Sequence, residues 1–287
     1  MDCVVLDTLD PYFNQACEES LFLHRTGSLL VVWRNAPAVV CGKYQNIYAE
    51  VSLPSAQAQN IAILRRETGG GTVYHDEGNL NYAIMTDRGD TQGYEPFLAP
   101  IVDALRALGA DAQTGRICDI AVNGKKVSGS AQKVSGGRVW HHGTLLFSAD
   151  LTRLRGVANG ARREYVSKGV QSSPWPVANL CDVLPHTDAL AFRDALLRKL
   201  GAEPTPMTAE ELATAETLAR EKYRAWDWTF GKNPAFTLTR QTPQGELVME
   251  SKNGVITALN LAPEFVGQRL DPQNPMLLAS PLCPYLF

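Results

Sequence analysis

Apolar positions along the chain recur at two spacings, which predict helices packed against a sheet. A helical spacing, with apolar residues three or four positions apart, occurs in the segments 10–25, 94–108, 188–200 and 209–223. The first of these helices is expected to begin at Asp10-Pro11, an N-cap followed by proline at the first helical position. A shorter helix is predicted over 55–59. Apolar or alternating runs typical of strands cover 3–6, 29–34, 38–42, 61–64, 80–85, 117–122, 126–133, 139–148, 236–239, 246–250 and 255–261.

The turns between these strands indicate the kind of sheet. Asn123-Gly124 and Asn253-Gly254 are strong hairpin signals, since both residue types tolerate the backbone of a tight turn. Asn35-Ala36-Pro37 is interpreted as a further hairpin turn, between 29–34 and 38–42. Hairpins outnumber strand–helix–strand crossovers, so we expect an α/β (α+β) fold with a mixed, largely antiparallel sheet flanked by helices.

A change in pattern near Asn233-Pro234-Ala235 predicts a domain boundary. Residues 1–236 contain the predicted helices and most of the strands. Residues 237–287 hold a small strand-rich C-terminal appendage with a proline-rich tail. We therefore expect one large domain over 1–236 and a short second segment over 237–287.

Composition narrows the class of protein. The chain has 287 residues, a formal net charge of −3, 45% hydrophobic and 20% charged residues, which is ordinary for a globular protein and argues against a nucleic-acid partner. It has no apolar run of about 18 residues, so no membrane span is expected. The first residues show neither the basic nor the apolar region of a signal peptide, and a cytoplasmic location is the expectation.

The six cysteines are scattered, without a metal-ligand spacing. Most lie in apolar surroundings, as small buried side chains of a reducing compartment do. Cys118 is the exception, because Asp119 follows it directly and Arg116 lies two positions before it.

A glycine-rich stretch between two predicted strands carries the clearest chemical signal. Gly69-Gly70-Gly71 follows Arg65-Arg66 and precedes His75-Asp76. Three glycines cost backbone entropy, and such runs occur where the backbone takes unusual angles or where something approaches it closely. Backbone N–H groups here could hold an anion. Taken alone, the run is more typical of a hairpin turn than of a binding site, and both interpretations remain open at this point.

Five separated blocks, in order, resemble the lipoate–protein ligase A family of the biotin/lipoate ligase superfamily. The blocks are Trp33-Arg34-Asn35 with Val39-Val40, Gly42 and Gln45-Asn46; 65–79, reading RRETGGGTVYHDEGN; 125–131, KKVSGSA; 141–146, HHGTLL; and 226–236, WDWTFGKNPAF. They span roughly residues 1–236.

The resemblance implies an ATP-dependent enzyme that uses Mg²⁺. Such a ligase converts lipoate, or octanoate, to the acyl-adenylate and releases pyrophosphate. It then transfers the acyl group to a lysine of a lipoyl domain, in E2 subunits of 2-oxoacid dehydrogenases or in the glycine-cleavage H protein. Negative charge grows on phosphorus in the first step, so fixed donors and a cation directed at it would accelerate the reaction.

The resemblance also implies roles for particular residues. Lys126 is expected to be the catalytic residue, because its ammonium would bridge the lipoyl carbonyl and the α-phosphate. The nucleotide and adenylate would be held by Arg66, Gly69, Gly70, Gly71, Thr72, Val73 and Tyr74, together with Lys126 and Asp119. The wall of the acyl pocket is expected at Trp33, Val39, Val40 and Tyr44.

Asp119 is expected to bind Mg²⁺, which prefers one or two carboxylates plus phosphates. The family has a GRND-type segment here, whereas this chain reads Gly115-Arg116-Ile117-Cys118-Asp119. This chain has one residue more between Arg116 and Asp119 than the family segment has between its arginine and aspartate, which leaves the role of Arg116 open. The histidines His75, His141 and His142 match no zinc spacing. We expect His75 to hydrogen-bond within the glycine loop, and one of the 141–142 pair to face outward, because alternate strand residues point to opposite faces.

Two alternatives remain open from the sequence. Related acyltransferases use a cysteine nucleophile without ATP, and Cys118, near cationic side chains, raises a cysteine-dependent octanoyltransferase. Residues 237–287 resemble only the start of the accessory domain of longer ligases, so a transfer-only lipoyltransferase that accepts a preformed adenylate is the second alternative. Nothing in the pattern separates lipoate from octanoate.

Overall fold

The computed structural model describes residues 2–89, 93–116, 118–158, 162–173, 175–185 and 187–287. Eight strands in this part of the chain form the main sheet: β1 (Asp2–Leu6), β2 (Leu29–Trp33), β6 (Asn79–Asp87), β7 (Ala112–Thr114), β8 (Asp119–Val122), β9 (Lys125–Ser135), β10 (Arg138–Leu146) and β12 (Glu203–Pro204). Their order is β12-β1-β2-β6-β10-β9-β8-β7. The predicted start of one strand, Ile117, lies outside the described residues.

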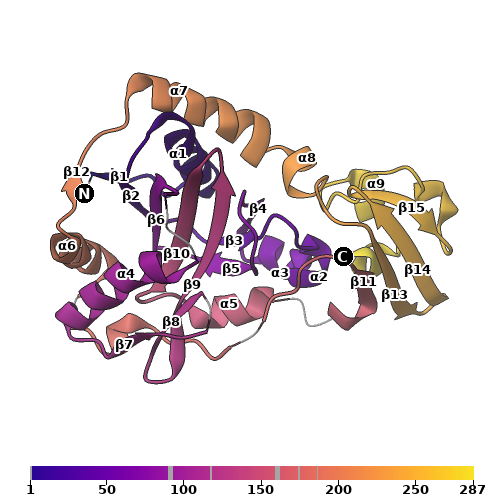
Figure 1. Ribbon diagram of the computed structural model, residues 1–287. Coiled ribbons are helices and arrows are strands. Elements are labelled where there is room, and N and C mark those ends of the chain that lie inside the picture. The colour runs from indigo at the N-terminus through magenta and orange to yellow at the C-terminus, as the bar shows by residue number, and fades with distance from the viewer. Residues whose placement is uncertain (1, 90–92, 117, 159–161, 174, 186) are drawn as a thin grey trace.

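Most neighbouring strands of this sheet are antiparallel. From β2 through β6, β10, β9 and β8 to β7, every pair is antiparallel. The pairs β1–β2 and β1–β12 are parallel. The Asn123-Gly124 turn between β8 and β9 has φ angles of 52° and 74°, as its hairpin geometry requires. The prediction of a mixed, largely antiparallel sheet flanked by helices is confirmed (Figure 1).

A three-stranded sheet lies beside the main one, in the order β4-β3-β5. Its strands are β3 (Ala38–Cys41), β4 (Ala62–Arg65) and β5 (Val73–His75). The predicted hairpin between 29–34 and 38–42 is wrong, because β2 pairs with β1 and β6 whereas β3 pairs with β4 and β5. The Pro37 carbonyl accepts the N–H of Ala62 at 3.0 Å, which turns the chain into the second sheet.

Four longer helices cover the two faces of the main sheet: α1 (Pro11–His24), α4 (Glu95–Leu108), α6 (Ala189–Leu200) and α7 (Ala209–Leu218). The Asp10 carboxylate accepts the backbone N–H groups of Tyr12 and Phe13, so α1 begins where its cap predicts. Helix α7 continues into a π-helical turn, η3 (Ala219–Tyr223). The shorter helices are α2 (Ile47–Glu50), α3 (Leu53–Ala58), η1 (Arg162–Glu164), α5 (Leu151–Val157), η2 (Leu180–Asp182), α8 (Trp226–Thr229), η4 (Pro263–Phe265), α9 (Pro275–Leu278) and α10 (Cys283–Leu286).

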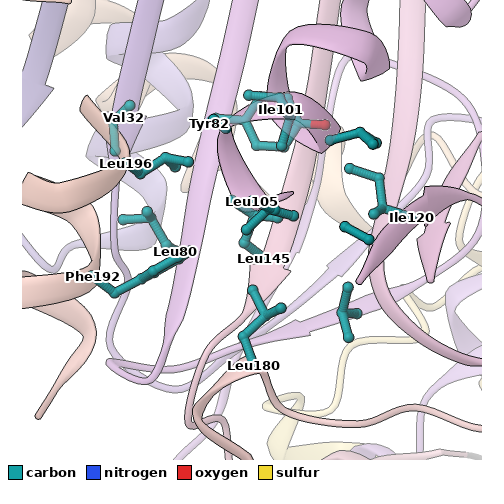
Figure 2. Packing of buried hydrophobic residues seen from close by; sticks show 14 of the residues in the cluster. Val32, Leu80, Tyr82, Ile101, Leu105, Ile120, Leu145, Leu180, Phe192 and Leu196 are labelled. Atoms are coloured by element: carbon teal, nitrogen blue, oxygen red, sulfur yellow. The ribbon is translucent and has the colours of Figure 1, made fainter. Parts of the chain in front are cut away.

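Strand alternation sends neighbouring side chains to different sides of the sheet. On one side, Leu80 and Leu145 pack with Ile101 of α4 and Phe192 of α6 (Figure 2). On the other side, β6 and β10 meet residues of α1, as in the contact cluster that contains Leu21 and Trp140. This second side also carries Asn81, one position after Leu80, and it faces the small sheet.

The C-terminal segment forms a further sheet together with a short strand from earlier in the chain, in the order β11-β13-β14-β15. Its strands are β11 (Tyr165–Ser167), β13 (Phe236–Thr242), β14 (Gly245–Lys252) and β15 (Val255–Leu259). This strand-rich part shares a buried cluster with α2, in which Tyr48 contacts the ring of Phe236 at a centroid distance of 5.4 Å. Tyr48 Oη also donates to the Leu270 carbonyl. In the described part of the chain, no helix has the length and apolar character needed to cross a bilayer.

Candidate active site

A cavity of about 360 Å³ lies between the main sheet, α1 and the small sheet. Its lining comes from residues far apart in the sequence: Gln15, Trp33, Val40, Arg66, Gly70, Gly71, Thr72, Val73, His75, Asn81, Arg116, Cys118, Asp119, Lys126, Gly129, Ser130, Ala131, His142, Gly143, Thr144 and 170–173. The glycine loop and Lys126 therefore face the same space, as the sequence predicts.

A second cavity, of about 230 Å³, adjoins the first. Thr72, Val73 and Lys126 line both spaces, and Tyr74 lines the second. Of the predicted pocket wall, Trp33 and Val40 line the larger cavity and Val39 the smaller one. Tyr44 is 58% exposed and lines neither cavity, so that part of the predicted wall is wrong. Its ring lies 3.7 Å from the position of a Cβ on Gly69, at the outer side of the loop.

The glycine loop connects β4 to β5 on opposite edges of β3, so it is not a hairpin turn. Close backbone approach explains its composition. A Cβ on Gly42 would lie 2.1 Å from the Gly70 carbonyl oxygen, and Gly70 itself has φ +81°. A Cβ on Gly71 would lie 3.2 Å from Ser172 Oγ. Side chains at these positions would push the loop away from its neighbours.

Arg66 fixes the shape of this loop. Its buried guanidinium donates to the carbonyls of Val40 (3.0 Å), Gly69 (2.5 Å) and Gly71 (2.7 Å), and to Thr68 Oγ1 (3.1 Å). Burial lowers the pKa of Arg66 to about 10, which still leaves it charged at neutral pH. Most N–H donors of the Arg66 guanidinium are therefore hydrogen-bonded to the protein itself, and the positive charge lies beneath the glycine loop.

Arg65 precedes the glycine loop and was given no role of its own from the sequence, yet it is one of the largest fully buried side chains. It donates to the carbonyls of Gly42, Lys43, Gln45 and Thr229 at 2.8 to 3.1 Å. Arginine has five donors, and here they connect the small sheet to α8. Arg65 thus fixes the 42–45 segment, whose Gly42 lies directly against the Gly70 carbonyl of the glycine loop.

Lys126 and Asp119 form an ion pair on adjacent strands. The distance from Lys126 Nζ to Asp119 Oδ1 is 2.6 Å, and the two side chains are 25% and 9% exposed. The backbone of Lys126 is held by the Pro176 carbonyl (2.9 Å) and by the Ala178 N–H (3.0 Å). The ammonium thus lies where the two cavities meet, with its counter-ion already in place.

The three histidines are held by protein contacts. His75 Nδ1 lies 2.9 Å from Asn35 Nδ2, so the predicted partner within the glycine loop is wrong. The pKa of His75 is lowered to about 3, mainly by burial and further by the nearby charges of Arg66 and His142. His141 stacks on Phe97 at 4.9 Å.

His142 contacts Glu18 (2.6 Å) and Thr68 (2.7 Å). The predicted outward-facing histidine is wrong, because helices cover both faces and both residues are buried. Across the described residues, no group of three or more His, Cys, Asp or Glu side chains is placed to hold a metal.

Comparison with known proteins identifies the family. The family model described as "Lipoyl protein ligase A/B catalytic domain" matches residues 10–201. Lipoate-protein ligase LplJ of Bacillus subtilis (strain 168) is 33% identical over 90% of this chain and 83% of its own length. Lipoate–protein ligase 1 of Staphylococcus aureus (strain Mu50 / ATCC 700699) is also 33% identical, over the same shares. The chain belongs to the lipoyl protein ligase A/B family.

Solved structures agree with this assignment. The bi-partite lipoate protein ligase of Thermoplasma acidophilum, described with its E2 lipoyl domain, has a TM-score of 0.68 at 26% identity, over 79% of this chain and 95% of that one. Lipoate-protein ligase A bound with ATP gives the same TM-score and identity, over 79% and 97%. The T. acidophilum protein Ta0514 with bound lipoic acid gives 0.67 at 25%, over 80% and 98%. The sequence-based resemblance is confirmed, and the protein is a ligase of this class.

Within this ligase, Cys118 lines the larger cavity, but its surroundings disfavour the thiolate that a nucleophile requires. Burial, and then the carboxylate of Asp119, raise the pKa of its thiol. A nucleophilic cysteine requires the opposite shift. Arg116 lies on Trp175, 4.9 Å from the ring centroid, and its guanidinium also reaches Ser173 Oγ (3.3 Å). The cysteine-dependent alternative is not favoured.

Ser172 is a site residue that sequence reasoning missed. Its Oγ accepts the Thr72 N–H at 2.9 Å and donates to Glu50 Oε2 at 2.6 Å. The buried Glu50 also pairs with Arg162. These residues tie the 162–173 segment of the ligase to the glycine loop. The segment is polar and without period, so no sequence signal distinguishes Ser172 from a surface serine.

Proposed function

We propose that this protein is an ATP-dependent lipoate–protein ligase that forms an acyl-adenylate and transfers the acyl group to a lysine. Family membership supports the class, and the observation that carries the mechanism is the position of Lys126 at the junction of two cavities. The larger cavity would take lipoate or octanoate. The smaller one, lined by Val73 and Tyr74, would take the nucleotide.

In the first step, a carboxylate oxygen of the acid attacks the α-phosphorus of ATP. The new bond joins that oxygen to phosphorus, while the bond to the bridging oxygen breaks and pyrophosphate leaves. Charge grows on the α-phosphate oxygens, and the Lys126 ammonium faces that position. The backbone N–H groups of Gly70 and Gly71 would supply fixed dipoles beside it, which need no reorganisation during the reaction, whereas the Thr72 N–H is already bonded to Ser172.

In the second step, the neutral amine of the acceptor lysine attacks the acyl carbon. An amide bond forms, the bond between the acyl carbon and the phosphate oxygen breaks, and AMP leaves. The amine proton is lost to solvent. Lys126 would again face the developing charge, on the carbonyl oxygen and on the departing phosphate. One cation thus serves both half-reactions.

A magnesium ion would bind at the carboxylate of Asp119 and neutralise phosphate charge. The residue fits this role, since Mg²⁺ usually takes one or two protein carboxylates and completes its shell with phosphates and water. Asp119 is buried in the wall of the larger cavity beside Lys126, next to the junction of the two cavities at which the α-phosphate would lie.

The acceptor proposed for this ligase is a lipoyl domain of a 2-oxoacid dehydrogenase E2 subunit or the glycine-cleavage H protein. The T. acidophilum ligase described with its E2 lipoyl domain supports the first of these. We assign catalysis to residues 1–236 and an accessory role to 237–287. A reducing, cytoplasmic location is proposed because all six cysteines are free thiols.

A mass-spectrometric assay tests the proposal. The full chain is incubated with ATP, Mg²⁺, lipoate and an apo lipoyl domain, and the acceptor lysine is expected to gain the lipoyl mass. Omission of ATP should abolish that gain. A gain with synthetic lipoyl-AMP but none with ATP and lipoate would contradict the proposal, and would establish a transfer-only enzyme instead.

A further inference from the structure

Arg116 is an exposed cation on the wall of the larger cavity, and its guanidinium has no carboxylate partner among the described residues. The groups that it contacts are neutral. Its Cζ lies 4.9 Å from the centroid of the Trp175 ring, and its Nη1 donates to Ser173 Oγ at 3.3 Å. Arginine has five N–H donors in one plane, and stacking on an aromatic face leaves the edge of that plane open. The cavity wall therefore carries a positive charge with donors that these two contacts do not use.

The ring under this guanidinium is held by the backbone of the proposed catalytic lysine. The Lys126 N–H donates to the Pro176 carbonyl at 2.9 Å, one residue after Trp175. A Cβ on Gly115 would lie 2.7 Å from the Trp175 ring, so the ring packs directly against the backbone that precedes Arg116. The position of the stacked pair is thereby coupled to that of Lys126.

The backbone of Arg116 is in turn bonded to the residue of the proposed magnesium site. Arg116 lies in the turn between β7 and β8, where the Gly115 N–H donates to the Asp119 carbonyl at 2.8 Å and the Asp119 N–H donates to the Arg116 carbonyl at 3.3 Å. The strand order is β2-β6-β10-β9-β8-β7, with Trp33 on β2 and Lys126 on β9. This turn and Trp33 consequently lie on opposite sides of Lys126 along the sheet.

The arrangement matches the direction in which pyrophosphate would leave. The larger cavity is lined from Trp33 to Lys126, and an acid in that part of it would bring its carboxylate to Lys126. The attacking and leaving oxygens lie roughly in line through phosphorus in such a displacement. Attack from the β2–β10 side therefore directs the pyrophosphate toward β8, where Asp119 and Arg116 lie. Arg116 and Ser173 are exposed, so the leaving group also has a path to solvent there.

We propose that Arg116 binds the β- and γ-phosphates of ATP and the pyrophosphate that they become, and that Trp175 positions its guanidinium. The inference rests on the proposed function. When the bond between the α-phosphorus and the bridging oxygen breaks, its electron pair stays on the pyrophosphate, and the guanidinium meets the charge so gained. Its planar fork can donate to two phosphate oxygens at once. Lys126 thus serves the α-phosphate, and Arg116 serves the leaving group.

The two half-reactions separate this role from a general effect on the site. In ATP–pyrophosphate exchange with lipoate, Arg116→Ala should raise the KM for ATP and for pyrophosphate by about tenfold or more, because charge-assisted hydrogen bonds are lost. Transfer from synthetic lipoyl-AMP to an apo lipoyl domain should keep the rate of the parent, since that adenylate has no β- or γ-phosphate. Arg155→Ala, at an exposed arginine of α5 that lines neither cavity, is the matched control.

Further variants test the geometry. Arg116→Lys keeps the charge but loses the planar fork, so it should recover only part of the affinity for pyrophosphate. Trp175→Leu removes the stacking surface and should raise the KM for pyrophosphate, though by less than Arg116→Ala does. Trp175→Phe keeps a ring and should restore the parent value. Inhibition of ATP-dependent lipoylation by inorganic pyrophosphate gives a second readout, which a merely structural role of Trp175 would not move.

Thermal unfolding of each variant is measured in parallel. An unchanged KM for pyrophosphate in Arg116→Ala would overturn the inference. Equal losses in exchange and in transfer from lipoyl-AMP would also overturn it, because Arg116 would then act on the adenylate or on the fold. Absence of ATP–pyrophosphate exchange in the parent with every acid would instead overturn the proposed function.

Discussion

Lys126 Nζ lies 2.6 Å from Asp119 Oδ1, and the lysine of this pair also lines the second cavity. The carboxylate holds the ammonium at the junction between the two spaces. Both side chains come from antiparallel strands whose register shifts between Ile120 and Ala121, which brings Ala121 opposite Lys126. A surface lysine on a regular hairpin would have no such fixed position.

Lys126→Ala is expected to abolish adenylate formation. Removal of a charge that faces the developing phosphate charge typically costs about a hundredfold or more in rate. The side chain is only partly buried, so the variant should unfold at nearly the same temperature as the parent. ATP–pyrophosphate exchange measures the effect, with exposed Lys125→Ala as the control. Near-normal exchange in Lys126→Ala would overturn the assignment.

Cys118→Ala is expected to leave the ligase active. The thiol is kept protonated by burial and by Asp119, so it contributes no nucleophile. The measurement is the rate of lipoyl transfer to an apo lipoyl domain, with and without ATP. Loss of transfer in the variant, or ATP-independent transfer by the parent, would show that the cysteine-dependent reaction is the correct one.

Gly42→Ala is expected to displace the glycine loop. The added Cβ would lie 2.1 Å from the Gly70 carbonyl oxygen, and Arg66 holds that loop from below. Overpacking of this kind costs roughly 1–3 kcal/mol and should also weaken ATP binding. Gly156→Ala in helix α5 is a matched control, because the atom nearest its added Cβ is the side-chain amide of Gln59, at 3.4 Å. Equal behaviour of the two variants in unfolding and in exchange would contradict this account.

Local signals in the sequence predicted the local structure. They did not predict which strands pair when those strands are far apart in the sequence. The cap at Asp10 and the turn at Asn123-Gly124 depend on a few adjacent residues, so both were predicted. Strand β3 pairs with β4 and β5, which come later in the chain. The Asn35-Ala36-Pro37 turn signal, from which a hairpin with β2 was predicted, contains no information on those later strands. The same reason applies to Ser172, whose role exists only because Thr72 lies beside it.

The resemblance placed Lys126 and the glycine loop in one site, and the cavity contains both. It could not predict the far end of the cavity. Gln15 lies in an amphipathic helix where a polar residue is ordinarily exposed, and its burial follows only from the packing of α1 on the sheet. Side-chain orientation and partner choice are tertiary properties, which explains why the position of Gln15 in the cavity wall was not evident from the sequence.

Glu67 provides a prediction about acid stability. Its carboxylate meets the ammonium groups of Lys43 (2.8 Å), Lys133 (2.8 Å) and Lys222 (3.1 Å). Burial alone would raise the pKa of Glu67, but the hydrogen bonds from Lys133 and Lys43 and the charge of Lys222 lower it from 4.5 to about 2. Because the folded-state pKa is depressed, this stabilisation is complete above pH 4.5 and is lost as the pH falls toward 2.

Glu67→Gln should therefore lower the free energy of unfolding near pH 7 by up to about 3 kcal/mol, since each pKa unit corresponds to about 1.4 kcal/mol. The difference from the parent should shrink steadily between pH 4.5 and 2, where the parent itself takes up the proton. Urea denaturation at pH 7, 4.5 and 3 measures this convergence. Glu221→Gln, at an exposed ion pair, should run parallel to the parent at every pH. A constant difference in the free energy of unfolding between Glu67→Gln and the parent at all three pH values would contradict this account, because it would show that the Glu67 carboxylate does not stabilise the fold through the three lysines.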